Sequence, residues 1–272
     1  MVDWFEKVLG KGWKVTPAGG LTGDAYVAEK DNKRLFLKRN SSPFLAVLSA
    51  EGIVPKLVWT KRMDNGDVIT AQEWLEGREL KPAEMQQPQV AEILHKIHHS
   101  TELLHMLMRL GKKPVTSDDS FVTIQQRLHA SGLLSSYNDI HLALTYLKRL
   151  LPITREQKQV VCHGDLNHNN LVLTNEGNLF LIDWDNAIIA DPVTDFGMVM
   201  KSYIPQEDWD TWLLNYGVDK DKYLIERMYW YLLLDSLHYL SWHSERREQV
   251  KMEERLENIQ DFNAHIGTTI LR

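Results

Sequence analysis

The stretch that decides the fold is residues 161–170, VCHGDLNHNN, together with residues 181–185, LIDWD. Two short apolar runs, Leu171–Thr174 and Leu179–Ile182, lie between these polar segments. They flank residues 175–178, NEGN, whose Asn and Gly residues are typical of a turn. The pattern predicts a β-hairpin with polar side chains gathered at its open end.

The spacing of this hairpin brings metal-ligand side chains together. A four-residue turn at 175–178 sets Asn170 opposite Asp183 across the two strands. Amide and carboxylate oxygens suit Mg²⁺, which takes few protein ligands and completes its shell with water and phosphate. Asp165 precedes Asn170 by five residues. It is expected to reach over the same ion or over a substrate hydroxyl.

These residues resemble a known family. Residues 163–166, HGDL, followed by Asn170 and then by Asp183, resemble the aminoglycoside phosphotransferase and choline kinase family of small-molecule kinases. The separation of eighteen residues between Asp165 and Asp183 fits that family. The resemblance covers most of the chain and implies a protein-kinase-like fold. It implies that Asp165 is the catalytic base, and that Asn170 and Asp183 hold Mg²⁺ against the phosphates of ATP.

The first part of the chain is rich in strands. Ala25–Glu29 and Leu35–Lys38 predict one hairpin, and Leu57–Thr60 and Val68–Glu73 predict another. One short helix is expected here, over Phe44–Ala50. This β-rich lobe spans about 75 residues.

Beyond Gly77 the apolar residues recur at helical spacing. Helices are expected over Phe121–Ala130, Asp139–Leu151, Gln206–Tyr216, Lys220–His243 and Glu245–His265. A short strand, Val160–Cys162, and the hairpin interrupt them. The chain is therefore predicted to be an α+β protein of two lobes, residues 1–76 for nucleotide binding and residues 77–272 for the larger helical part with its embedded catalytic hairpin.

The first lobe offers a nucleotide site. Residues 19–23, GGLTG, precede a strand, and small residues there let backbone amides approach phosphate oxygens. The resemblance implies that Gly20, Thr22 and Gly23 cover the nucleotide, and that Lys38 contacts its phosphates.

Two details of this lobe bear on nucleotide binding. The resemblance implies that backbone groups near Glu73 and Leu75 read the adenine edge. The usual glutamate partner of the lysine lies on the first-lobe helix, yet between Lys38 and Pro55 the single acid is Glu51, near the end of the expected helix. Either Glu51 replaces that partner or Lys38 has none.

The phosphoryl acceptor is expected to bind to the helical lobe near Asp165. One broad helix face, by i, i+3 and i+4 spacing, holds Tyr231, Asp235, His238, Tyr239 and Trp242. His168 and Asp185 are further candidates close to the reaction centre. Aromatic rings with an acid suit a cation such as choline or an aminoglycoside, and aromatic rings with hydroxyl and imidazole groups suit a sugar or nucleoside.

A finer resemblance points to the sugar class. Residues 42–46, SPFLA, and 51–60, EGIVPKLVWT, are similar to a branch of the family found in Gram-positive bacteria, the CcrZ/YtmP-like proteins. That branch is associated with control of the cell cycle. The resemblance implies a kinase for ribose or deoxyribose compounds.

The amino-acid composition limits the classes of molecule that the protein is expected to bind. Of 272 residues, 31 are Lys or Arg and 37 are Asp or Glu, a net charge of −6 that speaks against a general nucleic-acid binder. One cysteine, Cys162, excludes a disulfide framework and favours the reducing cytoplasm. No leader peptide and no membrane span are expected. A small hydroxyl-bearing molecule is the expected partner.

Two other functions compete with an active kinase. A nucleotide-binding pseudokinase would act through protein partners, and the missing helix glutamate favours it. A metal-dependent hydrolase would use His163, Asp165 and His168, but the further acids or histidines that it needs are not evident.

Two motifs are set aside. Asp195-Phe196-Gly197 spells the metal motif of protein kinases, yet it lies thirty residues beyond Asp165. Asp195 is instead expected to brace the catalytic loop, and Asp191 to cap the following helix. His95 and His99 form an i, i+4 pair that could bind a metal, but a helix packing face is the better interpretation.

Overall fold

A computed structural model describes residues 3–18, 24–218 and 222–271. The chain divides into two compact units. The first combines residues 1–82, 101–106 and 167–185; the second combines residues 83–100, 107–166 and 186–272. The division expected at residues 76 and 77 stays a prediction. The contacts group the embedded hairpin with the N-terminal sheet.

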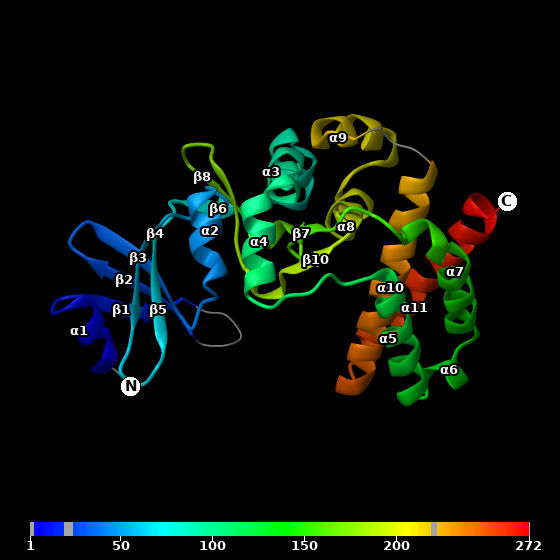
Figure 1. The fold of residues 1–272 in the computed structure, drawn as a ribbon, viewed down its shortest axis with the longest axis horizontal. Helices are drawn as coiled ribbons and strands as arrows, with labels where there is room; N and C mark the ends of the chain where they lie inside the picture. Colours follow the sequence, from blue (N-terminus) through cyan, green and yellow to red (C-terminus); the bar gives the residue numbers. More distant parts are fainter. Residues whose placement is uncertain (1–2, 19–23, 219–221, 272) are drawn as a thin grey trace. The chain divides into compact units, whose positions relative to one another are not determined.

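The first unit is built on a five-stranded antiparallel sheet (Figure 1). Its strand order is β1-β2-β3-β5-β4. The strands are β1 (Lys14–Pro17), β2 (Ala25–Lys30), β3 (Lys33–Arg39), β4 (Leu57–Arg62) and β5 (Val68–Glu73). Both predicted hairpins are confirmed, since β2 pairs with β3 and β4 pairs with β5.

Two helices accompany this sheet. Helix α2 (Phe44–Ala50) lies where the sequence predicted it. Helix α1 (Asp3–Leu9) was not predicted, so the expectation of a single helix in this part is wrong. Phe5 and Leu9 of α1 pack on a core made of Ala28, Leu37 and Ala71. Burial of these apolar residues against the sheet stabilises a helix of seven residues that would be marginal alone.

A second, three-stranded sheet of the first unit holds the predicted hairpin. Its order is β6-β8-β9, formed by β6 (Gly77–Glu79), β8 (Leu171–Thr174) and β9 (Leu179–Leu181). The hairpin is confirmed, but its register differs by one residue from the prediction. Leu171 pairs with Leu181, so the residue opposite Asn170 is Ile182, whose backbone N–H donates to the Asn170 carbonyl over 2.8 Å.

The turn explains the different register. Gly177 has φ +87°, the left-handed region that favours glycine, and its N–H donates to the carbonyl of Thr174 over 3.0 Å. The Thr174 N–H in turn donates to the carbonyl of Asn178 over 2.9 Å. Such a three-residue loop with a left-handed glycine is a common hairpin connection. Asn170 and Asp183 are therefore not directly opposite, as predicted, because the loop is one residue shorter.

The second unit is mainly helical (Figure 1). Its helices are α3 (Pro88–His99), α5 (Ser117–Ala130), α6 (Leu133–Ser136), α7 (Asn138–Thr154), α8 (Val193–Tyr203), α9 (Trp209–Tyr216), α10 (Lys222–Arg246) and α11 (Gln249–His265). Helix α4 (Thr101–Arg109) contributes residues to both units. The predicted helices correspond to α5, α7, α9, α10 and α11, with ends that differ by a few residues. Residues 219–221, at the expected start of α10, lie outside the described residues.

The core of the second unit surrounds α10. Trp230 is fully buried and donates its indole N–H to the Leu147 carbonyl of α7 over 2.8 Å. Helix α10 also packs on α5, α8 and α11. A two-stranded sheet joins the predicted strand β7 (Val160–Cys162) to β10 (Ile188–Ala190) in antiparallel register. These strands position the polar loop that follows Cys162.

The architecture is the predicted α+β arrangement, with an antiparallel N-terminal sheet and a larger helical C-terminal part. Among the described residues, no helix is both long enough and apolar enough to pass through a lipid bilayer.

Candidate functional site

The first unit gathers the predicted phosphate and metal residues around Lys38. The Lys38 ammonium at the end of β3 lies 3.1 Å and 3.0 Å from the two carboxylate oxygens of Asp185. It also lies 3.9 Å from a carboxylate oxygen of Asp183. Both acids are largely exposed, with side-chain exposures of 62% and 54%, so this group is open to a ligand in water. The group combines one cation with two hard oxygen donors.

Contacts with α2 position this acidic segment. The Leu181 N–H donates to the carbonyl of Ile53, just beyond α2, over 2.9 Å. Trp184 meets Phe44 of α2 edge to face, with ring centroids 5.7 Å apart. Asp183 lies between these two anchors with φ +62°. A left-handed backbone is uncommon for a residue other than glycine and often occurs at functional positions.

Asn170 and His168 belong to a short 3₁₀ turn, His168–Asn170, directly before β8. The Asn167 side chain accepts the Asn169 N–H over 3.0 Å and so caps this turn. Asn170 is half-buried, and its backbone is fixed by the bond from Ile182. Asn170 therefore lies at an ordered hairpin base that also leads to Asp183.

Gly20, Thr22 and Gly23 lie outside the described residues. Glu73 ends β5, where its N–H donates to the Lys56 carbonyl over 2.9 Å, and Leu75 follows between β5 and β6. Their roles stay predictions.

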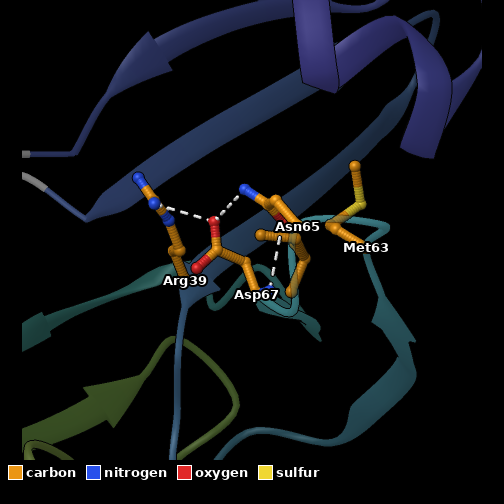
Figure 2. Close-up of a pocket in the computed structure, with 5 residues that line it drawn as sticks. Arg39, Met63, Asn65 and Asp67 are labelled. Carbon is orange, nitrogen blue, oxygen red and sulfur yellow. Dashed lines mark hydrogen bonds and ion pairs between the residues drawn. The ribbon is translucent and has the colours of Figure 1, made fainter.

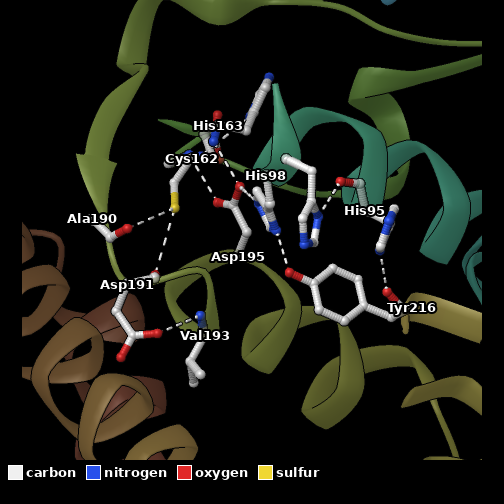
Figure 3. A network of polar contacts seen from close by, with 12 residues as sticks. His95, His98, Cys162, His163, Ala190, Asp191, Val193, Asp195 and Tyr216 are labelled. Carbon is white, nitrogen blue, oxygen red and sulfur yellow. Dashed lines mark hydrogen bonds and ion pairs between the residues drawn. The ribbon is translucent and has the colours of Figure 1, made fainter. Parts of the chain in front are cut away.

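The second unit holds the loop with Asp165, and a buried carboxylate braces this loop (Figure 3). Asp195 of α8 accepts the backbone N–H of His163 over 2.7 Å and that of Gly164 over 3.1 Å. The Asp165 N–H donates to the His163 ring over 3.3 Å. Asp195 thus has the bracing role that the sequence analysis gave it, and it is not a metal motif of protein-kinase type.

A histidine extends this network. His98 Nε2 lies 3.2 Å from Asp195, and its Nδ1 lies 2.7 Å from the Tyr216 hydroxyl (Figure 3). His98 and Asp195 are 3% and 1% exposed. Burial raises the pKa of Asp195, but hydrogen bonds from His98 and from the His163 backbone outweigh it and bring that pKa below its usual value. Asp195 is therefore an ionised brace whose charge is matched by donors.

The loop that contains Asp165 needs a glycine at position 164. It has φ +78°, and a Cβ atom at this position would lie 2.6 Å from the carbonyl oxygen of Asn186. That contact is far too close, so glycine alone lets the loop of residues 163–166 pass beside residue 186.

One buried group has the composition of a metal site. His98, Cys162 and Asp195 place their ligand atoms within 4.8 Å of one another. Burial, together with the nearby carboxylates, raises the pKa of the Cys162 thiol well above its usual value. An ion there would displace the backbone donors held by Asp195, so a hydrogen-bond network fits this group better.

The predicted histidine packing face is present. His95 Nδ1 lies 2.7 Å from the Tyr216 carbonyl, and His99 Nδ1 lies 2.8 Å from the carbonyl of His95. The two imidazole rings stack with centroids 4.0 Å apart. The His95 contact joins α3 to α9, as expected for a structural role, whereas the contacts of His99 stay within α3.

Asp191 holds the start of helix α8 through its carboxylate. It accepts the Val193 N–H over 3.0 Å and lies 3.5 Å from the Arg227 guanidinium. Burial raises the pKa of Asp191, while Arg227 opposes that shift. Tyr231 donates its hydroxyl to Asp191. The structure therefore places Tyr231, one of the predicted acceptor residues, in a buried ion-pair network.

A separate group of charged and aromatic residues of the second unit lies on α10 and α11. Asp235 of α10 is half-buried, and its charge interacts with those of Asp165 and Arg255. Burial raises the pKa of Asp235 to about 6, Arg255 of α11 lowers it, and Asp165 raises it further. Burial raises the pKa of Tyr239, one turn along α10. The charges of Asp235 and Asp165 raise this pKa further, and that of Arg255 lowers it. The charge of the predicted base thus acts on the pKa of both Asp235 and Tyr239.

Two aromatic rings near the C-terminal end of α10 are in cation–π contact with arginine side chains. The Arg255 guanidinium lies 4.7 Å from the Tyr239 ring centroid, and that of Arg246 lies 3.9 Å from the Trp242 centroid. Both rings keep 37% of their surface exposed. Burial and the nearby Arg127 lower the pKa of His238 to about 4, so this imidazole is neutral at pH 7.

A further small pocket lies on the N-terminal sheet, lined by Arg39, Met63, Asn65, Asp67 and Ile69 (Figure 2). The Asp67 carboxylate accepts from Asn65 over 2.7 Å, from Asn40 over 3.0 Å and pairs with Arg39 over 2.7 Å. The bond from Asn40 is the main cause of the lowered pKa of Asp67. These bonds shape the connection from β4 to β5.

Sequence reasoning missed two site features. The pairing of Lys38 with Asp185 joins residues 147 positions apart, and Asp185 was predicted only as an acceptor residue. Arg255 was not among the predicted site residues, although its guanidinium lies 4.7 Å from the Tyr239 ring centroid. A signal was present in the sequence. Met252, Ile259 and Ile266 recur every seven residues and mark the apolar face of α11, and Arg255 lies at the border of that face.

The chain matches the phosphotransferase enzyme family over residues 15–231. The chain belongs to this family. It is a phosphotransferase, as the motif around Asp165 predicted. The match spans both units and includes the Lys38 group, the loop with Asp165 and the first part of α10.

Solved structures of the same fold agree. The choline kinase LicA from Streptococcus pneumoniae is 18% identical, with 96% of each chain covered and a TM-score of 0.69. The GDP and kanamycin complex of APH(2")-IIia is 15% identical over 96% of this chain and 97% of that chain, with a TM-score of 0.71. The AMP-bound complex of spectinomycin phosphotransferase APH(9)-Ia is 14% identical over 98% of both chains, with a TM-score of 0.67.

Proposed function

We propose that this phosphotransferase moves the γ-phosphoryl group of ATP to a hydroxyl group of a small molecule. The observation that carries the proposal is the Lys38 group, in which one ammonium meets the carboxylates of Asp183 and Asp185. A phosphoryl-transfer site needs a cation for the phosphates and oxygen ligands for a metal. Solved relatives of the same fold were determined with GDP or AMP, which supports a purine nucleotide.

The donor set fits Mg²⁺. Asn170 and Asp183 supply an amide oxygen and an exposed carboxylate from one hairpin base, and both are hard ligands. They would hold the ion, which when bound neutralises charge on the phosphate oxygens. Lys38 would exchange part of its pairing with Asp185 for the phosphates, since an ammonium can donate three hydrogen bonds.

Asp165 would act as the general base. Its carboxylate would accept the proton of the acceptor hydroxyl while the new O–P bond forms and ADP leaves. Asp195, through the backbone N–H groups of His163 and Gly164, fixes the loop that presents Asp165. A fixed carboxylate aligns the nucleophile, which is most of what this reaction requires from the protein.

We further propose a sugar or nucleoside of ribose or deoxyribose type as the acceptor. The exposed rings of α10 support a neutral acceptor, because Arg255 and Arg246 already cover Tyr239 and Trp242 at cation–π distance. The resemblance to the Gram-positive branch suggests a cytoplasmic kinase with a role in cell-cycle control. A choline or aminoglycoside acceptor is the main alternative.

The test measures ADP formation from ATP with Mg²⁺ and a panel of acceptors. The panel contains ribose, deoxyribose, nucleosides, choline, ethanolamine, thiamine and aminoglycosides. We expect one class to stimulate ADP formation, and we expect Asp165→Asn to remove the stimulation while ATP binding persists. Asp64→Asn, an exposed acid in the β4–β5 turn, is the control and should behave as wild type.

The other outcomes are informative. Stimulation by choline alone would replace the sugar by a cationic acceptor. ATP binding without any stimulated turnover would favour a regulatory pseudokinase. Activity that persists in EDTA would refute the role of Asn170 and Asp183, and unchanged turnover in Asp165→Asn would refute the assigned base.

A further inference from the structure

The last residue of α9, Tyr216, is held against α3 through both its backbone and its side chain. Helix α9 ends because Gly217 takes φ +96°, and the Tyr216 carbonyl is one of the last four of the helix, which lack a helical partner. That carbonyl accepts the His95 Nδ1–H over 2.7 Å, and the Tyr216 hydroxyl lies 2.7 Å from His98 Nδ1 (Figure 3). The Tyr216 ring also packs on Phe196 of α8, with centroids 4.7 Å apart. The hydroxyl is therefore fixed in place beside His98.

The hydrogen-bond partners of His98 determine where its ring carries hydrogen. An ionised carboxylate such as that of Asp195 can only accept, so His98 Nε2, 3.2 Å away, carries a hydrogen. Tyr216 is 2% exposed, and in the part of the chain that the structure describes its hydroxyl has one hydrogen-bond partner, His98 Nδ1. Burial raises the pKa of Tyr216 above its ordinary value, so the hydroxyl keeps its proton and needs an acceptor.

One arrangement of hydrogens satisfies both side chains. If His98 carried a second hydrogen on Nδ1, it would donate to Tyr216, and the Tyr216 proton would lack an acceptor among the described residues. A buried donor without an acceptor is costly. If Tyr216 instead donates to Nδ1, every polar atom of the two side chains is bonded. His98 is then neutral, with its hydrogen on Nε2.

We propose that Tyr216 is a positioning residue for phosphoryl transfer, because its hydroxyl fixes His98 as the Nε2–H tautomer that holds Asp195. Asp195 in turn accepts the two backbone N–H groups directly before Asp165, over 2.7 Å and 3.1 Å. The contacts thus run from the end of α9, through two buried side chains, to the loop that presents the predicted base. This inference rests on the proposed function and deepens it. Tyr216 acts through these groups and does not itself react.

The first experiment detects the tautomer. ¹⁵N NMR of the histidine rings near neutral pH distinguishes a nitrogen that carries a hydrogen from one that accepts, and the His98 signals are those that disappear in His98→Gln. We expect the neutral Nε2–H form in the wild type. In Tyr216→Phe, Nδ1 loses its donor beside an ionised Asp195, so we expect partial protonation of Nδ1. A doubly protonated His98, or the Nδ1–H form, in the wild type would overturn the proposal.

The second experiment tests whether the tautomer matters for the reaction. With ribose as acceptor, Tyr216→Phe should lower kcat about two- to tenfold, the usual effect of one hydrogen bond, and leave the KM for ATP unchanged. In His98→Gln the side-chain nitrogen is a fixed donor, so the added Tyr216→Phe substitution should change kcat little. Equal losses in the wild-type and His98→Gln backgrounds would assign Tyr216 a packing role and overturn the proposal.

The third experiment needs no turnover. Hydrogen exchange at the amides of His163 and Gly164 should accelerate in Tyr216→Phe, and exchange as slow as in wild type would overturn the proposal. Tyr229→Phe is the matched control, because Tyr229 is also buried, 3% exposed, and packs on Phe262 of α11. It should match wild type in kcat and in exchange.

The outcomes separate this inference from the function on which it rests. If no hydroxyl compound stimulates turnover by the wild type, the proposed phosphoryl transfer is refuted. The tautomer of His98 and the exchange rates would still decide whether Tyr216 fixes His98 and the loop before Asp165.

Discussion

The Lys38 ammonium lies midway between the two carboxylate oxygens of Asp185, at 3.1 Å and 3.0 Å. The sequence analysis left open whether Glu51 or no acid at all balances this lysine. The structure provides Asp185, with Asp183 at 3.9 Å. A carboxylate partner therefore comes from the same segment as the predicted metal ligand, and it keeps Lys38 extended toward that ligand.

The first prediction concerns Lys38. Lys38→Met should raise the dissociation constant for ATP by about tenfold or more, because a charge-assisted phosphate contact is lost. The thermal midpoint should change little, since partly exposed ion pairs contribute little to stability. Isothermal calorimetry with ATP measures the first effect. Lys61→Met, an exposed lysine of strand β4, is the control, and equal ATP affinity in Lys38→Met and wild type would contradict the assignment.

The second prediction concerns Gly164. Gly164→Ala and Gly111→Ala both introduce a side chain at positive φ, which costs about 1–2 kcal/mol. Only at Gly164 would the new Cβ meet a backbone oxygen, that of Asn186 at 2.6 Å; at Gly111 nothing lies within 4 Å. Gly164→Ala should therefore lose more stability in urea unfolding, and also most of its kcat. Equal losses in the two variants would show that backbone strain alone matters.

The third prediction concerns Asp195. Asp195→Asn replaces one of two accepting oxygens by an amide donor that faces the N–H groups of His163 and Gly164. A buried site with mismatched donors should lose about 2–4 kcal/mol of unfolding free energy. Hydrogen exchange at the amides of His163 and Gly164 should accelerate strongly. Protection as in wild type at these two amides would mean that Asp195 does not brace the loop.

The fourth prediction is a pH dependence of stability. Burial raises the pKa of Asp235 from 3.8 to about 6, with Arg255 lowering and Asp165 raising it, so the folded chain binds this proton more tightly than the unfolded chain. The contribution of Asp235 to stability is therefore greatest below pH 3.8 and is lost as the pH rises through about 6. Asp235→Asn should gain up to about 3 kcal/mol over wild type at pH 8, and progressively less toward pH 4.

A neighbouring histidine has the opposite effect in the same range. The pKa of His238 is lowered from 6.5 to about 4 by burial and by Arg127, so its contribution to stability is lost as the pH falls. The two slopes partly cancel in the wild type. Urea unfolding from pH 4 to pH 8 should therefore reveal the Asp235 slope most clearly in His238→Gln. A pH profile unaltered by Asp235→Asn would contradict the raised pKa.

Much of this fold follows from local sequence. Alternating apolar residues and turn signals predicted the N-terminal hairpins, and helical spacing predicted most long helices, because these patterns reflect which faces are buried. The hairpin register could not be fixed from composition. It depends on whether Gly177 closes a loop of three or of four residues, and both loops suit the same amino acids.

The site was less predictable than the fold. Asp165, Asn170 and Asp183 were found because they lie in one short motif. The partner of Lys38 depends on how α2 and β9 meet, through the bond from Leu181 to Ile53. Such long-range contacts leave no periodic trace in the sequence. Helix α1 was missed for the same reason, since its stability comes from the sheet that it covers.

The burial of Cys162 has a practical consequence. It is the sole thiol in the chain, it is fully buried in β7, and its raised pKa keeps it protonated near neutral pH. Maleimide reagents should therefore leave the native chain unlabelled without any cysteine being removed. A cysteine introduced at one exposed position would then accept a fluorophore or spin label alone, which makes this chain a ready background for single-site spectroscopy.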